Sequence, residues 1–197
     1  MAKEYERTDV RRRQIAEAAL DVIAEQGLGC FTAKAVAERV GIADGSIFRH
    51  FANKREIVLA AMDRLEEGLF PDPKLEDENP LMRLESFFRH RAMVVGAGGA
   101  VGRLVFSNEL AHAAGEEGWN RIRSWRRRSL ELVRGCLCEI SDLGRLNEDL
   151  SPKEAAQLIQ GRLLGLMLDR SMTSDPASDI EEQITGAWTT LSQLLFS

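Results

Sequence analysis

The sequence is poor in proline, tyrosine and cysteine, and it has no long apolar run. Five prolines and one tyrosine occur in 197 residues, whereas Ala, Leu, Arg and Glu are abundant. These abundant residues have high helix propensity, so the composition favours helix throughout the chain. No stretch of about 18 uncharged apolar residues is present, and no transmembrane helix is expected. The first residues lack an apolar signal core, which predicts a cytoplasmic protein with no membrane partner.

Patterns typical of metal or cofactor sites are also scarce. The chain has three cysteines: Cys30, Cys136 and Cys138. They are odd in number and lack the spacing of a structural zinc site. The glycines at 96–102 do not fit G-x-G-x-x-G, because Val101 occupies the third glycine position. Glu109 and His112 could share a helix face and ligate a metal, but no second pair accompanies them. We therefore expect no metal, no cofactor and no catalytic residues.

Charge is unevenly distributed along the chain. The formal net charge is −5, yet the first 60 residues carry ten Lys and Arg against nine Asp and Glu. The acidic excess therefore lies in the remaining residues. Arg11, Arg12 and Arg13 form a basic cluster near the start. A near-neutral N-terminal part with a basic cluster is compatible with one face that contacts phosphate.

Residues 32–54 have the pattern of a helix-turn-helix. Thr32 is suited to cap a helix of apolar residues at helical spacing, which Gly41 ends. A short second helix is expected from Asp44 to Phe51. Two short helices joined by a glycine-containing turn can place the second one in the major groove of DNA.

Helices are expected on both sides of this motif. A first helix with one apolar stripe should run from Thr8 or Asp9 to about Gln26 and pack across the two short helices. Asn53 should cap a fourth helix that covers residues 54–69. Beyond it, the patterns predict helices over about 80–95, 101–113, 118–141 and 152–171, and a last helix after a capping box at 178–181.

The last two helices carry more apolar surface than one buried face requires. Two such neighbours could form a four-helix bundle with a second copy of the chain, where Gly161 and Gly165 would allow close approach. The expected dimerisation residues are Leu158, Gly161, Gly165, Ile184, Trp188 and Leu191. A core within one chain is the alternative explanation of the same pattern.

Three segments of the N-terminal part together carry a family resemblance. They are AALDVIAEQG in the first helix, FTAKAVAERVGI in the second helix and turn, and GSIFRHFANKREI from the third helix into the fourth. In order and spacing these motifs resemble the TetR family of tetracycline-repressor-type regulators over residues 10–60. The resemblance implies an all-α fold: a three-helix DNA-binding domain at 1–53, and a helical effector-binding and dimerisation domain at 54–197. The helix from 54 to about 69 would link the two.

Helix geometry and the resemblance together indicate the DNA-binding residues. The expected set is Thr32, Asp44, Gly45, Ser46, Phe48, Arg49, His50 and Lys54. Arg49 is the candidate for a base edge, because a guanidinium can bond guanine in bidentate fashion. Thr32 stands at a helix start, where a hydroxyl and free backbone amides suit a phosphate. Lys54 matches the lysine with which the family contacts phosphate.

Two positions depart from the family pattern. The family usually has a serine where Ala43 stands and a tyrosine where Phe48 stands. Alanine cannot cap a helix, which typically costs about 1 kcal/mol. Phenylalanine keeps the stacking ring but lacks the hydroxyl that would bond a phosphate. We expect DNA binding to survive both changes, with a different operator preference.

For the C-terminal part, the resemblance implies a pocket for a small effector. Its candidate lining residues are Phe87, Phe88, Met93, Phe106, Trp119, Trp125 and Met167. Aromatic residues at helical spacing also form plain cores, so this alternative stays open. The expected function is that of a homodimeric repressor of a near-palindromic operator, with operator DNA and a small-molecule effector as partners. The alternatives are control by a protein partner, or a helical metalloenzyme with an accessory DNA-binding head.

Overall fold

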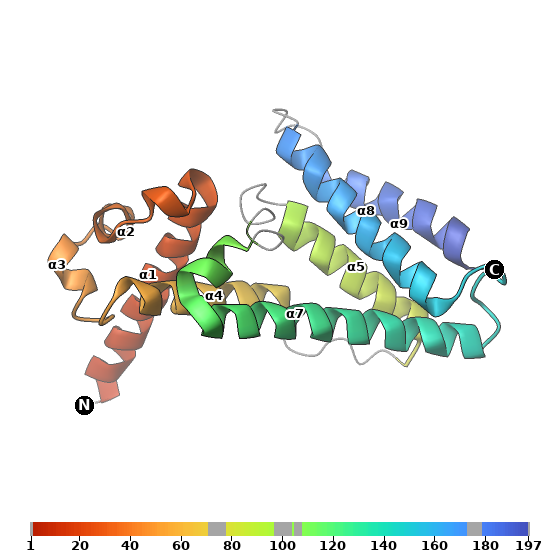
Figure 1. The fold of residues 1–197 in the computed structure, drawn as a ribbon, viewed down its shortest axis with the longest axis horizontal. Helices are drawn as coiled ribbons and strands as arrows, with labels where there is room; N and C mark the ends of the chain where they lie inside the picture. The colour runs from red at the N-terminus through yellow and green to blue at the C-terminus, as the bar shows by residue number, and fades with distance from the viewer. Residues whose placement is uncertain (1, 71–77, 97–103, 105–107, 173–178, 197) are drawn as a thin grey trace. The chain divides into compact units, whose positions relative to one another are not determined.

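Helices dominate the structure, a computed structural model that describes residues 2–70, 78–96, 104, 108–172 and 179–196. Figure 1 shows α1 (Ala2–Gln26), η1 (Leu28–Cys30), α2 (Ala33–Val40), α3 (Asp44–Ile47), α4 (Lys54–Leu69), α5 (Pro80–Gly96), α7 (Glu109–Asp142), α8 (Pro152–Met172) and α9 (Ile180–Leu195). Within these ranges, β pairing is limited to one isolated bridge between Leu146 and Phe196. The predicted all-α fold is confirmed. No helix in the described part of the chain is long and apolar enough to cross a bilayer.

Most predicted helix starts are confirmed by their caps. The Thr32 hydroxyl accepts a hydrogen bond from the Ala35 amide at 3.0 Å, and the Asn53 side chain accepts one from the Glu56 amide at 3.0 Å. Gly41 ends α2 in the left-handed conformation, with φ of 74°. This conformation favours glycine because it has no Cβ.

Two helices differ from their predicted limits in the N-terminal part. Helix α1 begins at Ala2 instead of Thr8 or Asp9, because the intervening residues are good helix formers and no breaker stops the helix. Helix α3 ends at Ile47 instead of Phe51. Ala43 provides no side-chain cap for it, and the turn that follows contains tight i to i+3 bonds.

The later helices largely follow the prediction. Asn79 caps α5 through a 3.0 Å bond from the Leu81 amide. Helix α9 is capped by Asp179, whose side chain accepts from the Glu181 amide at 2.8 Å. The predicted capping serine, at 178, lies outside the described residues, as do residues 101–103 and 105–107 of the predicted helix over 101–113.

The predicted break near residue 115 is present inside α7. Gly115 has φ of 68° and ψ of −148°, so α7 consists of a short segment before the kink and a long segment after it. Glycine adopts such a backbone at low cost, whereas other residues would be strained there. The kink becomes important for the contacts of α4 described below.

The chain divides into two compact units, and the division differs from the predicted boundary after residue 53. The N-terminal unit comprises residues 1–70 and 103–123, and the C-terminal unit comprises residues 71–102 and 124–197. Helix α4 belongs to the N-terminal unit because it packs along α1. Helix α7 begins in the N-terminal unit and continues into the C-terminal unit.

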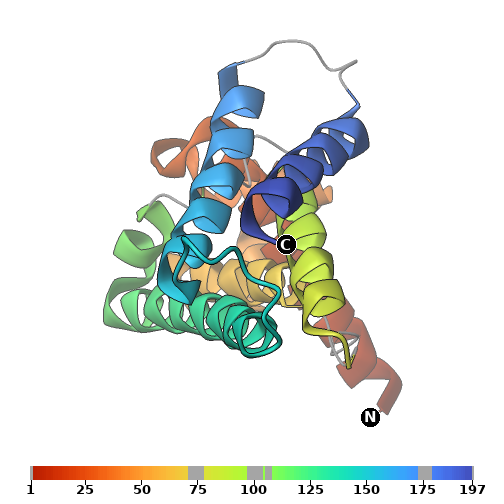
Figure 2. The same cartoon turned by 90° about the vertical axis from the view of Figure 1, so that its right-hand side faces the viewer.

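The core of the C-terminal unit is formed by α5, the second half of α7, α8 and α9. Figures 1 and 2 show α5, α8 and α9 side by side, and their contacts agree. Ile184, Trp188 and Leu191 lie in this core, and Trp188 packs on Phe88 with ring centroids 5.4 Å apart. For these three α9 residues the alternative explanation holds: the stripe predicted to join two chains packs within one chain.

The capping box at the start of α8 offers a direct test of local stability. The Glu154 amide donates to the Ser151 hydroxyl at 3.3 Å, and the Ser151 amide donates to the Glu154 carboxylate at 2.9 Å. Replacing Ser151 with alanine should lower the free energy of unfolding by about 1 kcal/mol, measured by urea titration. Ser141→Ala, an exposed control near the end of α7, should change it by less than about 0.5 kcal/mol. Equal losses in the two variants would show that the box contributes nothing.

Candidate nucleic-acid interface

The turn after α2 presents a polar and aromatic surface on a buried base. We call residues 44–51 the recognition turn. Ile47 and Phe51 are almost fully buried and anchor it, whereas Phe48 is 50% exposed. Asp44, Gly45 and Arg49 are exposed as well, and Ser46 is half-buried. The structure therefore brings four of the predicted DNA-contacting residues to the surface of one short segment.

An arginine of α1 holds the end of the recognition turn. The Arg12 guanidinium donates to the His50 carbonyl oxygen and lies 4.2 Å from the centre of the Phe51 ring. A cation suits this place, because the last carbonyls of a helical turn carry partial negative charge. The sequence showed Arg12 only as part of a basic cluster, so its contact with the turn was not foreseen.

His50 is half-buried instead of pointing freely outward. Its Nδ1 atom is buried and has no hydrogen-bond partner in the described part of the chain. Burial, followed by the positive charges of Arg11, Arg12 and Arg49, lowers the pKa of His50 below its ordinary value of 6.5. The imidazole is therefore neutral at pH 7, and it offers the surface no positive charge.

Two helix starts flank the recognition turn. Thr32 and Lys54 are both exposed, at the N-termini of α2 and α4. The first amides of a helix have no intrahelical acceptor and point toward any anion placed there. Both positions are consistent with the predicted phosphate contacts.

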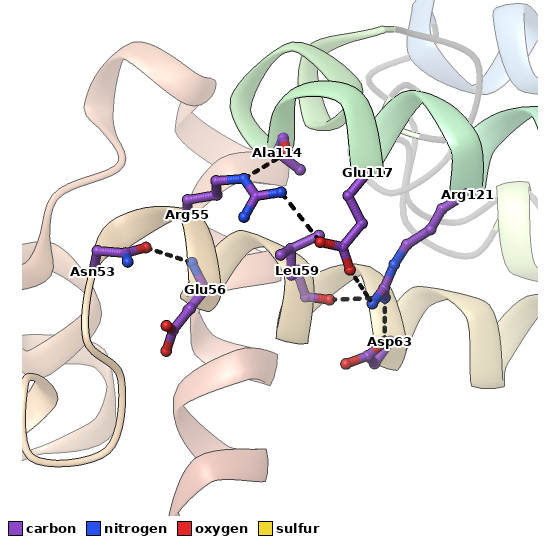
Figure 3. A network of polar contacts seen from close by, with 8 residues as sticks. All are labelled: Asn53, Arg55, Glu56, Leu59, Asp63, Ala114, Glu117 and Arg121. Atoms are coloured by element: carbon purple, nitrogen blue, oxygen red, sulfur yellow. Dashed lines mark hydrogen bonds and ion pairs between the residues drawn. The ribbon is translucent and has the colours of Figure 1, made fainter.

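Polar contacts tie the start of α4 to the kink of α7 (Figure 3). Arg55 donates from Nε to the Ala114 carbonyl at 2.9 Å and from Nη2 to the Glu117 carboxylate at 3.1 Å. Ala114 directly precedes the kink at Gly115, where the helical bonding pattern is interrupted. Arg55, the residue after Lys54, thus donates a hydrogen bond to a carbonyl group at the break in α7.

A second arginine ties the middle of α4 to the same segment of α7. Arg121 pairs with Asp63, bonds the Leu59 carbonyl at 3.4 Å and bonds Glu117 at 3.1 Å. Burial alone would lower the pKa of Arg121, but the two carboxylates raise it above its ordinary value. We call Arg55, Asp63, Glu117 and Arg121 the α4–α7 clamp.

A buried cation that the sequence did not reveal lies in the C-terminal unit. Arg91 is 6% exposed, donates to the Ser129 hydroxyl at 3.0 Å and lies 5.2 Å from the centre of the Phe87 ring. Burial lowers the pKa of Arg91 to about 10, and Arg128 adds repulsion. Arg91 falls at helical spacing within the buried stripe of α5, and a charge on such a stripe is the signal that could have revealed it.

Comparison with known proteins agrees with this geometry. The family described as bacterial regulatory proteins, tetR family, matches residues 15–61, which run from α1 into α4. The HTH-type transcriptional repressor KstR2 of Mycobacterium tuberculosis is 34% identical over 96 residues. Residues 15–61 are thus a tetR-family domain. This match covers 43% of the chain and 48% of KstR2, so it spans about half the length of that relative.

Other proteins resemble the whole chain. The fatty acid metabolism regulator protein of Bacillus subtilis is 24% identical over 192 residues, which cover 93% of each chain. The solved structure of KstR2 has a TM-score of 0.74 at 20% identity, over 95% of both chains. AibR in complex with isovaleryl coenzyme A and operator DNA has a TM-score of 0.71 at 21% identity, over 93% and 97%. FadR from Bacillus subtilis in complex with stearoyl-CoA has a TM-score of 0.65 at 22%, over 92% and 97%. These structures show a shared fold.

The predicted effector residues have different environments. Phe87, Phe88, Trp125 and Met167 are buried, and Met93 and Trp119 are half-buried. Phe87 and Phe88 belong to the core of the C-terminal unit. The last predicted residue, Phe106, lies outside the described residues. In the described part of the chain, no three His, Cys, Asp or Glu side chains gather as a metal site.

The predicted dimerisation residues of α8 are exposed, unlike those of α9. Leu158 is 43% exposed, Gly161 is exposed and Gly165 is half-buried. Leu164 and Leu168 are exposed on the same helix, and helical spacing places them on the same face.

The lowered pKa of His50 predicts a pH dependence of stability. In the unfolded chain the imidazole takes up a proton near pH 6.5, whereas in the folded chain it does so only at lower pH. The unfolded state therefore binds more protons as the pH falls below about 6.5, and the free energy of unfolding decreases. Urea titrations between pH 7.5 and 5 should show a shallower decrease for His50→Gln than for the unchanged protein. Identical slopes for the two proteins would contradict this account.

Proposed function

We propose that this chain is a transcriptional repressor that binds a near-palindromic operator as a homodimer and is released by a small-molecule effector. The observation that carries the proposal is the recognition turn with its exposed Phe48 and Arg49, flanked by the helix starts at Thr32 and Lys54. This arrangement offers side chains for base edges at its centre and anion-binding groups at its sides. The DNA-binding domain proposed for this role is residues 1–53, with α4 as the link to the rest of the chain.

The contacts proposed for the recognition turn differ in kind. Arg49 has a fixed fork of donors that suits a guanine edge. Phe48 presents an apolar ring that can contact a thymine methyl group. Thr32 and Lys54 contact phosphates, which position the domain without reading sequence.

The proposed effector is an acyl compound. Support comes from two tetR-like proteins of the same fold, described in complex with isovaleryl coenzyme A and with stearoyl-CoA. Support within the chain comes from the buried aromatic side chains of α5 and α7, Phe87 and Trp125. An effector that binds one conformation better shifts the chain toward it, and release of DNA follows if the recognition turns then no longer fit the half-sites.

The α4–α7 clamp is the proposed route of this coupling. Arg55 is the residue after Lys54, and its bonds to Ala114 and Glu117 connect the phosphate-binding end of α4 to the kink in α7. A change in the kink would alter these bonds and the position of Lys54. In this proposal the clamp intact and the clamp rearranged are the two states that allosteric coupling requires.

Selection of DNA from a random pool tests the proposed function directly. The full chain should enrich a near-palindromic sequence, because two identical recognition turns read two half-sites. The selected duplex then serves as the operator in all titrations. Recovery of no common sequence would contradict sequence-specific regulation.

Substitutions in the recognition turn should separate base contacts from phosphate contacts. Lys54→Ala should weaken binding about equally for all sequences and reduce the salt slope by about one, because one phosphate contact is lost. Arg49→Ala should relax the preference at one base pair, with a cost of about 1–3 kcal/mol on the operator. Fluorescence anisotropy titrations at several salt concentrations measure both effects, with Lys34→Ala, an exposed lysine of α2, as a charge-matched control. Unchanged operator binding in both variants would contradict the assignment.

The exposed face of α8 is the proposed dimer interface. Leu158, Leu164 and Leu168 present apolar surface there. A Cβ added at Gly161 would meet no atom within 4 Å, so the backbone is open to a partner helix. Helices approach closely where small residues replace side chains, and a two-copy bundle buries such a face.

A charge on this face should abolish the dimer. Leu158→Glu buries a carboxylate at the interface without a partner, and sedimentation velocity should show a monomer. Leu143→Glu, at another exposed leucine beyond the end of α7, should remain a dimer. A dimeric Leu158→Glu protein would rule out this face as the interface.

A further inference from the structure

Three hydrogen-bond donors lie on neighbouring positions of α5 and α7 in the C-terminal unit. Arg91 on α5 and Trp125 on α7 are 6% and 4% exposed. The Trp125 Nε1 atom is buried and has no hydrogen-bond partner among the described residues. Ser129 follows Trp125 by one helical turn, and its hydroxyl accepts from Arg91 Nη2 at 3.0 Å. Residues four apart on a helix are neighbours on one face, so Trp125 lies beside the residue that Arg91 contacts.

This cluster is made of hydrogen-bond donors and carries positive charge. The indole N–H and the guanidinium can only donate, and the Ser129 hydroxyl has a proton of its own to donate. Arg128 adds a second positive charge nearby, and the pKa of Arg91 is lowered to about 10 by burial and by that charge. Arg91 is still a cation at neutral pH. The Trp125 indole N–H is buried without an acceptor among the described residues, which is costly in a folded protein and points to an acceptor that arrives from outside the chain.

We propose that Arg91, Trp125 and Ser129 form a binding site for the anionic oxygen group of a largely apolar ligand. The group is a carboxylate or a phosphate, since both present several acceptor oxygens to a guanidinium. Phe87 lies against Arg91, with the guanidinium carbon 5.2 Å from its ring centre, and provides the apolar side. This inference rests on the proposed function and deepens it, because it names the groups that recognise the effector.

The site also lies on the helix that carries the α4–α7 clamp. Arg121, which bonds Asp63 and Leu59 of α4, precedes Trp125 by four residues on the same helix. An anion bonded to Trp125 would therefore act on α7 one turn from the contact with α4. The binding site and the coupling route share one element.

Calorimetric titration of the full chain with four probes tests the site. Stearate carries a carboxylate, coenzyme A carries phosphates, stearoyl-CoA carries phosphates and an acyl chain, and stearyl alcohol carries no anion. The unchanged protein should bind stearate or stearoyl-CoA more tightly than stearyl alcohol. Trp125→Phe and Arg91→Gln should each lower the affinity for whichever anionic probe binds more tightly, by about tenfold or more. This is the usual effect of losing a hydrogen bond to a charged group. Both should change stearyl alcohol binding by less than about threefold, since its contact is apolar.

Matched variants control for packing and charge. Trp188→Phe removes the same atoms from an indole in the core of the C-terminal unit, and Arg134→Gln removes the same charge from an exposed position of α7. Both should bind the anionic probes as the unchanged protein does. If Arg91→Gln does not fold, Trp125→Phe and the milder Ser129→Ala decide the question. The indole N–H proton resonance of Trp125, identified by its loss in Trp125→Phe, should move downfield when the anionic probe binds.

The probes also distinguish the two sources of the anion. If the variants lose affinity only for the probes that contain coenzyme A, the bound group is a phosphate. If they lose affinity for stearate, the bound group is a carboxylate. The site is overturned if the variants bind the anionic probes as tightly as the unchanged protein, or if that protein binds none of them or prefers stearyl alcohol. Operator binding is measured separately, so a chain that binds its operator but no anionic probe would refute the site and leave the DNA-binding role intact.

Discussion

The bond from Arg55 to the Ala114 carbonyl is the contact on which the connection between α4 and α7 depends. The bond joins a charged donor at the start of α4 to a carbonyl beside the break in α7. At the break, Gly115 has a backbone conformation that only glycine adopts readily. Arg121 repeats the connection two turns further along α4, where it pairs with Asp63. Ion pairs on a surface contribute little individually, about 0–1 kcal/mol each. A connection built from such contacts can rearrange, which a regulated helix requires.

Helix α4 meets two opposing requirements: one face must be buried, and its first residues must stay exposed. Its apolar face packs along α1 and makes α4 part of the N-terminal unit, while Lys54 at its start remains exposed for phosphate. Coupling between an effector and DNA typically amounts to about 1–3 kcal/mol. Small shifts in a few polar contacts are therefore sufficient, and the buried core of the N-terminal unit need not change.

The parts of the fold predicted correctly depend on local chemistry. Thr32, Asn53 and Ser151 cap helices because their side chains reach backbone amides three residues away, and such caps are visible in the sequence. The early end of α3 was missed, because it depends on the tertiary anchoring of Ile47 and Phe51 and on Arg12 from another helix. The packing of α4 on α1 was not visible in the sequence for a similar reason, since it is a contact between distant segments.

In the candidate sites, too, features that depend on contacts between distant segments could not be predicted from the sequence. The motif of the recognition turn indicated its exposed residues, Phe48 and Arg49 among them. By contrast, the stripe containing Ile184 and Trp188 fitted both a dimer interface and a core, and sequence spacing does not distinguish these. Arg91 and the donor of Trp125 became visible only with their burial and bonding, because the sequence shows neither.

The affinity of the full chain for its selected operator, measured by fluorescence anisotropy with and without saturating stearoyl-CoA, tests the central claim most directly. The account predicts that the dissociation constant rises about fivefold or more with the ligand, and that operator DNA weakens ligand binding by the same factor. It also predicts that the unliganded chain prefers its operator to a scrambled duplex. Equal affinity for operator and scrambled DNA, or binding of both ligands with no mutual effect, would contradict it.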